Sequence, residues 1–424
     1  MMRTCFFALI FVTLLVPCAF AQRVHIDIQA QSFKKFKVAM PAYAGQSDLA
    51  TTLWSACAQD IRVSGVFDLL DPRGYINPGP LAEIAPGTLK DWSLIGADYV
   101  ISGSVSRGAG SVAISVQVIE LSTAEVILNT RYQTAETASY RAIHAFMDAL
   151  LERSLGLEPM FSSKIVAIRS ENGKKQLFVS WCDGAGGNTI RGGGNLVLNP
   201  AWSHDGKRIA FVSYWRNNPD LYLLDVASNK VRLVSGLQGI NITPSFDRTC
   251  ARLACTLSID GNPEIYLLDL SGPGRIRLTD SWATDTSPSI SPDGTQLVFC
   301  SSRAGSPQIY LMDISTKKVQ RVTYEGGYNT EPVFSPKGGL VAFTHLASDR
   351  RYHIALIRPD GTSMKVLPGT GLGDESPTFS PDGRLVAFAA SDGNIYVSDF
   401  MGISPARITD GGGYTEPCWS GVMK

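Results

Sequence analysis

The sequence lacks the short signatures that mark most enzymes and metalloproteins. It contains no Cys-x-x-Cys pair, no Gly-x-Ser-x-Gly elbow and no glycine-rich phosphate loop. Its five histidines are scattered without the spacing typical of zinc ligands. These absences argue against a zinc site, an elbow-type hydrolase and a nucleotide-binding loop. We therefore predict no catalytic residue, no cofactor and no metal ligand.

The chain also lacks an excess of charge of either sign. It has 38 Lys and Arg against 38 Asp and Glu in 424 residues, without charge runs or low-complexity tails. Nucleic-acid-binding proteins normally carry a basic stripe, so no nucleic-acid partner is expected. After the first residues, no apolar run approaches the roughly 20 residues that span a bilayer. We expect a mature protein that is exported, does not span a membrane and is monomeric.

The first residues differ in kind from the rest of the chain. Arg3 precedes an apolar run, 6–16, which is followed by Ala19-Phe-Ala21. A short positive region, an apolar core and an A-x-A site are typical of a cleaved secretory signal. We predict a signal peptide at 1–21, cut before Gln22. The short apolar run disfavours a membrane anchor, and a preceding proline disfavours lipidation at Cys18.

Six cysteines remain after this cleavage. They are Cys57, Cys182, Cys250, Cys255, Cys300 and Cys418. Export makes disulfides possible, but the spacing predicts no particular pairing. Cys255 stands where other repeats of the chain, described next, place phenylalanine, so we expect it to be a small core residue.

A repeat organises the chain from Pro200 onward. Copies of this proline recur at spacings of 44, 44, 44, 45 and 40 residues, at Pro244, Pro288, Pro332, Pro377 and Pro417. Each full repeat carries four strand-like segments, which read approximately P-x-[FW]-S, [IL]-A-F, [IL]-Y-L-x-D and R-[LIV]-T. A period of this length with four short strands indicates β-propeller blades.

Two fragments of the repeat predict how the propeller closes. Residues 164–199 hold only the last three strands of a repeat, whereas Pro417-Cys-Trp-Ser420 is a first strand with no blade behind it. Because open sheet edges invite association, we expect the C-terminal strand to complete the first blade. Five full repeats and one composite blade predict a six-bladed propeller over 161–424.

Residues 22–160 have a different pattern, which predicts a mixed α/β domain. Gly156 and Pro159 mark the linker that follows it. Strands are expected at 24–28, 36–40, 66–70, 98–105, 112–121 and 126–132, and helices at 49–62, 89–95 and 137–155. The fold class is thus a two-domain chain, in which this α/β domain precedes a propeller closed by the C-terminal strand.

The loops before each repeated proline predict a binding face. They join an outer strand to the next inner strand, so all of them lie at one mouth of the pore. Their selected residues are Asn241, Thr243, Thr284, Asp285, Thr286, Ser287, Asn329, Glu331, Asp374, Glu375 and Glu416. The carboxylates come from four blades and predict an acidic patch that docks a protein. Ordinary solvated loops are an equal alternative, and a cation in the pore is another.

The signal peptide, the α/β domain and the six-blade motif together resemble the TolB family of the Tol-Pal system, over essentially the whole chain. The resemblance implies a non-enzymatic periplasmic adaptor. Members bind the peptidoglycan-associated lipoprotein Pal at the propeller mouth and contact TolA through the mature N-terminus. They support outer-membrane integrity and constriction at cell division, and colicins exploit them for import. Other outer-membrane or peptidoglycan-associated partners are also implied.

Carried onto this chain, the TolA-contacting segment is 22–33. Gln22 begins it, and Val24, Ile26 and Ile28 alternate as expected for strand addition to a partner's sheet. An ordinary edge strand of the α/β domain is the alternative. The alternative function is an exported propeller enzyme, peptidase-like or a lyase, using the acidic pore. A histidine or serine beside a perturbed carboxylate in the pore would favour that enzyme.

Overall fold

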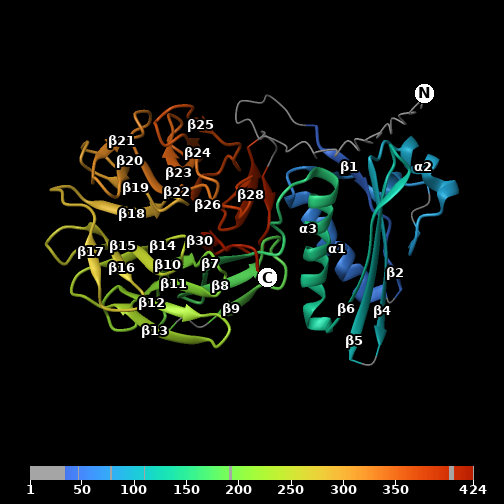
Figure 1. Ribbon diagram of the computed structural model, residues 1–424, viewed down its shortest axis with the longest axis horizontal. Helices are drawn as coiled ribbons and strands as arrows, with labels where there is room; N and C mark the ends of the chain where they lie inside the picture. Colours follow the sequence, from blue (N-terminus) through green and yellow to red (C-terminus); the bar gives the residue numbers. More distant parts are fainter. Residues whose placement is uncertain are drawn as a thin grey trace, which may run out of the picture.

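The structure is a computed structural model that describes residues 34–45, 47–76, 79–108, 110–190, 193–400 and 405–423. An α/β domain comes first along the chain and a β-propeller follows it (Figure 1). The predicted signal peptide, its cleavage site at Ala21 and Gln22, and the segment with Val24, Ile26 and Ile28 lie outside the described residues.

A six-stranded mixed sheet forms the N-terminal domain. Its order is β3-β1-β4-β5-β6, and β2 pairs with β4. The strands are β1 (Phe36–Ala39), β2 (Ala44–Gly45), β3 (Phe67–Leu69), β4 (Tyr99–Gly108), β5 (Ser111–Glu120) and β6 (Glu125–Thr134). β1 pairs in parallel with β3 and β4, which requires a crossover between β1 and β3. β4, β5 and β6 form an antiparallel meander.

Two long helices cover one face of this sheet and separate it from the propeller (Figure 1). The two long helices are α1 (Ser47–Val63) and α3 (Ser139–Leu155). The domain also has a short helix, α2 (Leu89–Leu94), and 3-10 turns at Pro72–Gly74, Pro86–Thr88 and Glu136–Ala138. Leu53 of α1 and Phe146 of α3 are fully buried in a cluster that also holds Trp419 of the propeller. One apolar core therefore continues from the first domain into the second.

Six four-stranded antiparallel sheets make the propeller. The first three of its five sequential blades are β10 (Val197–Trp202), β11 (Arg208–Ser213), β12 (Asp220–Asp225) and β13 (Lys230–Ser235); β14 (Asn241–Phe246), β15 (Arg252–Leu257), β16 (Glu264–Asp269) and β17 (Arg275–Arg277); and β18 (Asp285–Ile290), β19 (Gln296–Ser301), β20 (Gln308–Asp313) and β21 (Val319–Arg321). The next two are β22 (Asn329–Phe334), β23 (Val341–Leu346), β24 (Tyr352–Ile357) and β25 (Lys365–Val366); and β26 (Asp374–Phe379), β27 (Leu385–Ala390), β28 (Ile395–Asp399) and β29 (Ala406–Arg407).

The sixth blade joins the two ends of the propeller, which confirms the predicted closure. The C-terminal strand β30 (Tyr414–Trp419) pairs with β7 (Lys164–Glu171), and β8 (Lys174–Trp181) and β9 (Asn188–Ile190) complete the sheet. Trp419 lies opposite Ile165 and donates its indole N–H to Ser163 Oγ at 2.8 Å. The backbone N–H of Lys164 donates to Ser420 Oγ at 2.9 Å. The ring is thus closed by hydrogen bonds and by a buried aromatic side chain.

Local sequence explains the tight turns after the inner strands. Asp205 accepts a hydrogen bond from Ser203 Oγ at 2.6 Å, and Gly206 follows with a φ of 69°, which glycine adopts at little cost. The aromatic position of the repeat, which includes Trp202, Phe246, Phe334, Phe379 and Trp419, is buried as expected. Cys255 is fully buried in an interblade cluster, and all six cysteines are free thiols. No described helix is both long enough and apolar enough to cross a membrane.

Candidate functional site

The inner strands surround a central channel of about 620 Å³. In every blade the inner strand is interrupted by a register shift at the residue before the repeated proline. These six residues have φ angles between 46° and 56° and line the channel. We call them the pre-proline ring: Asn199, Thr243, Ser287, Glu331, Ser376 and Glu416. A left-handed φ is uncommon for residues with a Cβ, and a bulge re-aims the side chain that it carries.

Hydrogen bonds join the pre-proline ring in three pairs, each across a blade boundary. The backbone N–H of Ser287 donates to Thr243 Oγ1 at 3.3 Å, that of Ser376 donates to Glu331 Oε2 at 3.0 Å, and that of Asn199 donates to Glu416 Oε2. Glu331 also accepts a bond from Thr344 Oγ1 at 2.9 Å. Burial raises the pKa of Glu416. Both glutamates of the ring therefore hold neighbouring blades together.

Four of the predicted mouth residues are buried instead of facing solvent. Asn241, Asp285, Asn329 and Asp374 begin β14, β18, β22 and β26, and each is fully buried. Asn241 Oδ1 accepts a bond from Ser235 Oγ at 2.6 Å, and Asp374 Oδ1 accepts one from Thr370 Oγ1 at 2.6 Å. The side chains of Asn241 and Asp374 therefore bond to the segment that leads into their own strand.

The predicted acidic patch is consequently wrong for Asp285 and Asp374. Their carboxyl groups lie inside the protein, where burial raises the pKa of each. Asp285 Oδ2 accepts a hydrogen bond from the Arg303 guanidinium at 2.7 Å, so Asp285 also has an ion-pair partner within the fold. The sequence alone does not show that these polar residues occupy inward-facing positions of their blades.

The other predicted residues remain accessible at the mouth. Thr284 and Glu375 are exposed, while Thr243, Thr286, Ser287, Glu331 and Glu416 are half-buried. Partial desolvation and the nearby Glu331 carboxylate raise the pKa of Glu375. Among the predicted carboxylates, Glu375 is the one whose side chain is exposed at this face.

Exposed apolar side chains surround the mouth, and none of them is among the residues predicted from the repeat. Trp282, Tyr324 and Leu372 are 82%, 72% and 54% exposed, and lie in the loops that lead into β18, β22 and β26. Trp215, 59% exposed, lies in the β11–β12 loop, which opens on the same face. Grouped exposed apolar residues mark interaction sites, and Trp and Tyr dominate binding hot spots. We call Trp215, Trp282, Tyr324, Leu372 and Glu375 the mouth surface.

The channel does not assemble a hydrolytic arrangement among the described residues. No hydrogen bond there joins a histidine to a serine hydroxyl. The side chains of His144, His345 and His353 bond instead to Asp60, Asn329 and Asp349. Ser376 Oγ does lie 3.2 Å from the Glu331 carboxylate. That carboxylate, however, already accepts bonds from Ser376 N and Thr344 Oγ1. The contact thus favours a structural role over nucleophile activation.

The far end of the channel faces the N-terminal domain. Glu158 of the linker lines the channel there and forms an ion pair with Lys337. In the β26–β27 turn, the Arg384 guanidinium donates to the Ser64 carbonyl oxygen at 3.2 Å. The mouth surface is therefore at the end of the inner strands opposite to this contact, where the first domain leaves it accessible.

Known proteins resemble both parts of the chain. The profile of the TolB beta propeller domain matches residues 151–423, and that of the TolB amino-terminal domain matches 24–127. The Tol-Pal system protein TolB of Desulfosudis oleivorans is 31% identical over 247 residues, 56% of either chain. The protein TolB homolog of Chlorobium chlorochromatii is 34% identical over 218 residues, 51% of this chain and 48% of the relative. The chain spans about half the length of the curated relatives it matches.

A solved structure resembles the chain over most of its length. The crystal structure of TolB from Acinetobacter baumannii superposes with a TM-score of 0.78 at 26% identity, and the match covers 93% of this chain and 98% of that one. The similarity therefore extends across both the α/β domain and the propeller.

Proposed function

The chain belongs to the TolB family, and from this membership we propose that it is a non-enzymatic adaptor of the Tol-Pal system in the periplasm. Curated relatives carry the name of that system. The adaptor would bind the lipoprotein Pal through the mouth surface and TolA through the mature N-terminus, and so support outer-membrane integrity during cell division. The observation that carries the proposal is the group of exposed aromatic side chains around a polar channel.

The chemistry of the mouth surface suits a protein partner. Trp282 and Tyr324 offer large apolar rings at the rim, and burying such rings is the main source of binding energy at interfaces. The pre-proline ring supplies polar atoms inside the rim that can orient an inserted side chain. Glu375 adds an exposed carboxylate that would favour a basic or hydrogen-bond-donating contact on Pal.

The second contact is proposed for the segment that starts at Gln22. Its alternating Val24, Ile26 and Ile28 suit strand addition, in which backbone bonds give affinity and alternate side chains give register. TolA is the partner expected for this segment. An edge strand of the α/β domain remains the alternative use of the same residues.

A calorimetric titration of the mature chain with soluble Pal tests the first contact. Trp282→Ala and Tyr324→Ala should each weaken binding at least ~10-fold, which corresponds to about 1.4 kcal/mol. Leu94→Ala is the matched control, because Leu94 is an exposed apolar residue of α2, outside the propeller. Unchanged affinity in both mouth variants, with native circular dichroism, would contradict the proposal.

A further inference from the structure

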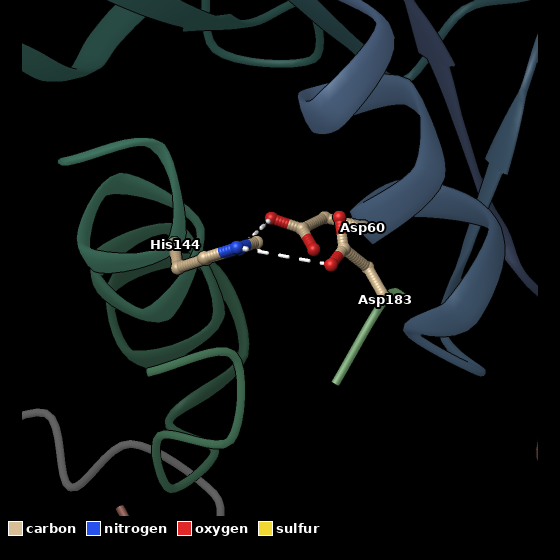
Figure 2. A group of neighbouring side chains, drawn as sticks. All are labelled: Asp60, His144 and Asp183. Atoms are coloured by element: carbon tan, nitrogen blue, oxygen red, sulfur yellow. Dashed lines mark hydrogen bonds and ion pairs between the residues drawn. The ribbon is translucent and has the colours of Figure 1, made fainter. Parts of the chain in front are cut away.

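Three buried ionisable side chains meet where the N-terminal domain contacts the propeller (Figure 2). Asp60 comes from the last turns of α1, His144 from the first half of α3, and Asp183 from the loop after β8. All three side chains are completely inaccessible to solvent. The cluster therefore draws two of its side chains from one domain and one from the other.

The geometry leaves several of these atoms without partners. His144 Nδ1 lies 2.8 Å from Asp60 Oδ2, whereas His144 Nε2 lies 3.8 Å from Asp183 Oδ1, too far for a hydrogen bond. Asp60 Oδ1, His144 Nε2 and Asp183 Oδ2 have no hydrogen-bond partner in the described part of the chain. Buried polar atoms are rarely left unpaired, so three at one place point to a ligand.

His144 is the one basic side chain that pairs with these carboxylates in the described part of the chain. No lysine or arginine of the described ranges forms an ion pair with Asp60 or Asp183. The neighbouring Asp148 carboxylate is occupied by the backbone N–H groups of 160–162. Cys182 Sγ is directed at the Phe161 carbonyl oxygen at 3.4 Å.

We propose that His144 and Asp183, with Asp60 positioning the imidazole, bind a divalent transition-metal ion, best matched by Zn²⁺, that links the N-terminal domain to the propeller. One atom from each residue lies within 4.8 Å of the other two. Zn²⁺ accepts imidazole nitrogen and carboxylate oxygen at about 2.0–2.2 Å, whereas Ca²⁺ and Mg²⁺ prefer oxygen alone. Tetrahedral ligands at such distances stand about 3.4 Å apart. The 3.8 Å between His144 Nε2 and Asp183 Oδ1 therefore needs only a small adjustment.

Asp60 positions the ligating histidine. Its Oδ2 accepts the Nδ1–H of His144, which fixes the imidazole with Nε2 toward Asp183, as a carboxylate commonly does for a ligating histidine. A metal ion on Nε2 lies at the opposite edge of the imidazole from Asp60, so the ligands are His144 Nε2 and the Asp183 carboxylate. The Trp181 ring, 4.8 Å from the His144 ring, limits how the imidazole can turn. The site lies at the domain contact and does not depend on partner binding at the mouth surface.

Metal analysis of the tag-free mature chain tests this site. After chelation, dialysis against Zn²⁺ and removal of excess metal, mass spectrometry should find about one Zn²⁺ per chain, and Mg²⁺ and Ca²⁺ should not compete. His144→Gln and Asp183→Asn should each weaken Zn²⁺ binding at least ~10-fold. His353→Gln is the matched control, since His353 pairs with Asp349 at 3.0 Å outside this cluster.

A Co²⁺ titration of the wild-type chain provides a test that needs no variant. The visible spectrum should show nitrogen and oxygen ligation without a thiolate charge-transfer band. Absence of bound metal, or Zn²⁺ binding that survives both His144→Gln and Asp183→Asn, would overturn the proposal. A thiolate band would overturn the ligand assignment, because it would indicate that Cys182 takes part.

Discussion

Asp374 occupies a position that four of the six blades fill with Asp or Asn. Asn241 and Asn329 stand at the equivalent place in their blades, and all three are fully buried. What the position requires is a short side chain that can bond to the loop before the strand, as Asp374 does to Thr370. The negative charge of Asp374 is therefore a cost of the position, and burial raises its pKa.

This raised pKa predicts a pH dependence of stability. Because the folded-state pKa of Asp374 lies above its ordinary value of 3.8, the folded state binds the proton more tightly than the unfolded state. The contribution of Asp374 to the free energy of unfolding is therefore most favourable below pH 3.8. This contribution is lost as the pH rises through the folded-state pKa. Asp374→Asn should thus gain stability relative to wild type between about pH 4 and pH 7, measured by urea unfolding.

Asp313→Asn is the control with the opposite sign. Hydrogen bonds from Ser315 and Thr316 lower the pKa of the Asp313 carboxyl to about 2, so its contribution is present above the unfolded pKa and lost only in acid. Asp313→Asn should not gain relative stability as pH rises. If the Asp374→Asn difference were the same at pH 4 and pH 7, the buried carboxyl would not titrate as described.

Glu331 and Glu375 show which properties of a single residue the sequence predicts and which it does not. Polar type, loop position and repeat register were enough to select Glu331 and Glu375 for one face of the propeller. They were not enough to distinguish Glu375, which is exposed, from Glu331, which bonds to Ser376 and Thr344. That distinction depends on the bulge before each proline, which turns the side chain toward the next blade. Charge reversal at Glu331 would therefore damage the fold before it tested a binding role.

At the scale of elements, β30 closes the propeller. It places Trp419 in the core shared by both domains, and the Trp419 indole N–H donates to Ser163. The strand comes last along the propeller, so the sixth blade is complete only after the whole propeller has been made. Removing contacts from β30 should consequently weaken both the ring and its junction with α1 and α3.

Trp419→Ala should lower the free energy of unfolding by about 3–5 kcal/mol, because it leaves a cavity where a large aromatic ring is buried. Denaturant unfolding followed by circular dichroism measures the change. Trp282→Ala is the matched variant, since that ring is exposed and should change stability by less than about 0.5 kcal/mol. A similar effect of the two substitutions would contradict the assignment of Trp419 to closure and Trp282 to the mouth surface.

The elements themselves were largely predictable from sequence. The 44-residue period and the orphan strand at Pro417 indicated six blades and their closure, because each blade must pair its own edge. Trp282 and Tyr324 were missed because they stand outside the strand motifs, in loops whose sequences differ from blade to blade. Aromatic residues in such loops were the available signal.

At the scale of the whole molecule, the two domains share a core and a charged cluster. Asp60, His144 and Asp183 are far apart in sequence, so no ligand spacing could indicate them, and only the packing of α1 and α3 on the sixth blade brings them together. The mouth surface lies at the end of the channel opposite to this junction. The propeller therefore leaves one face accessible and uses the other to hold the first domain.

Hydrogen exchange of the mature chain, with and without saturating soluble Pal, shows whether Pal binds the mouth surface. We expect slower exchange in 278–284, 322–328 and 367–373, the loops that carry Trp282, Tyr324 and Leu372 into β18, β22 and β26. Protection confined to the N-terminal domain, or no protection in these three loops at saturating Pal, would contradict this expectation.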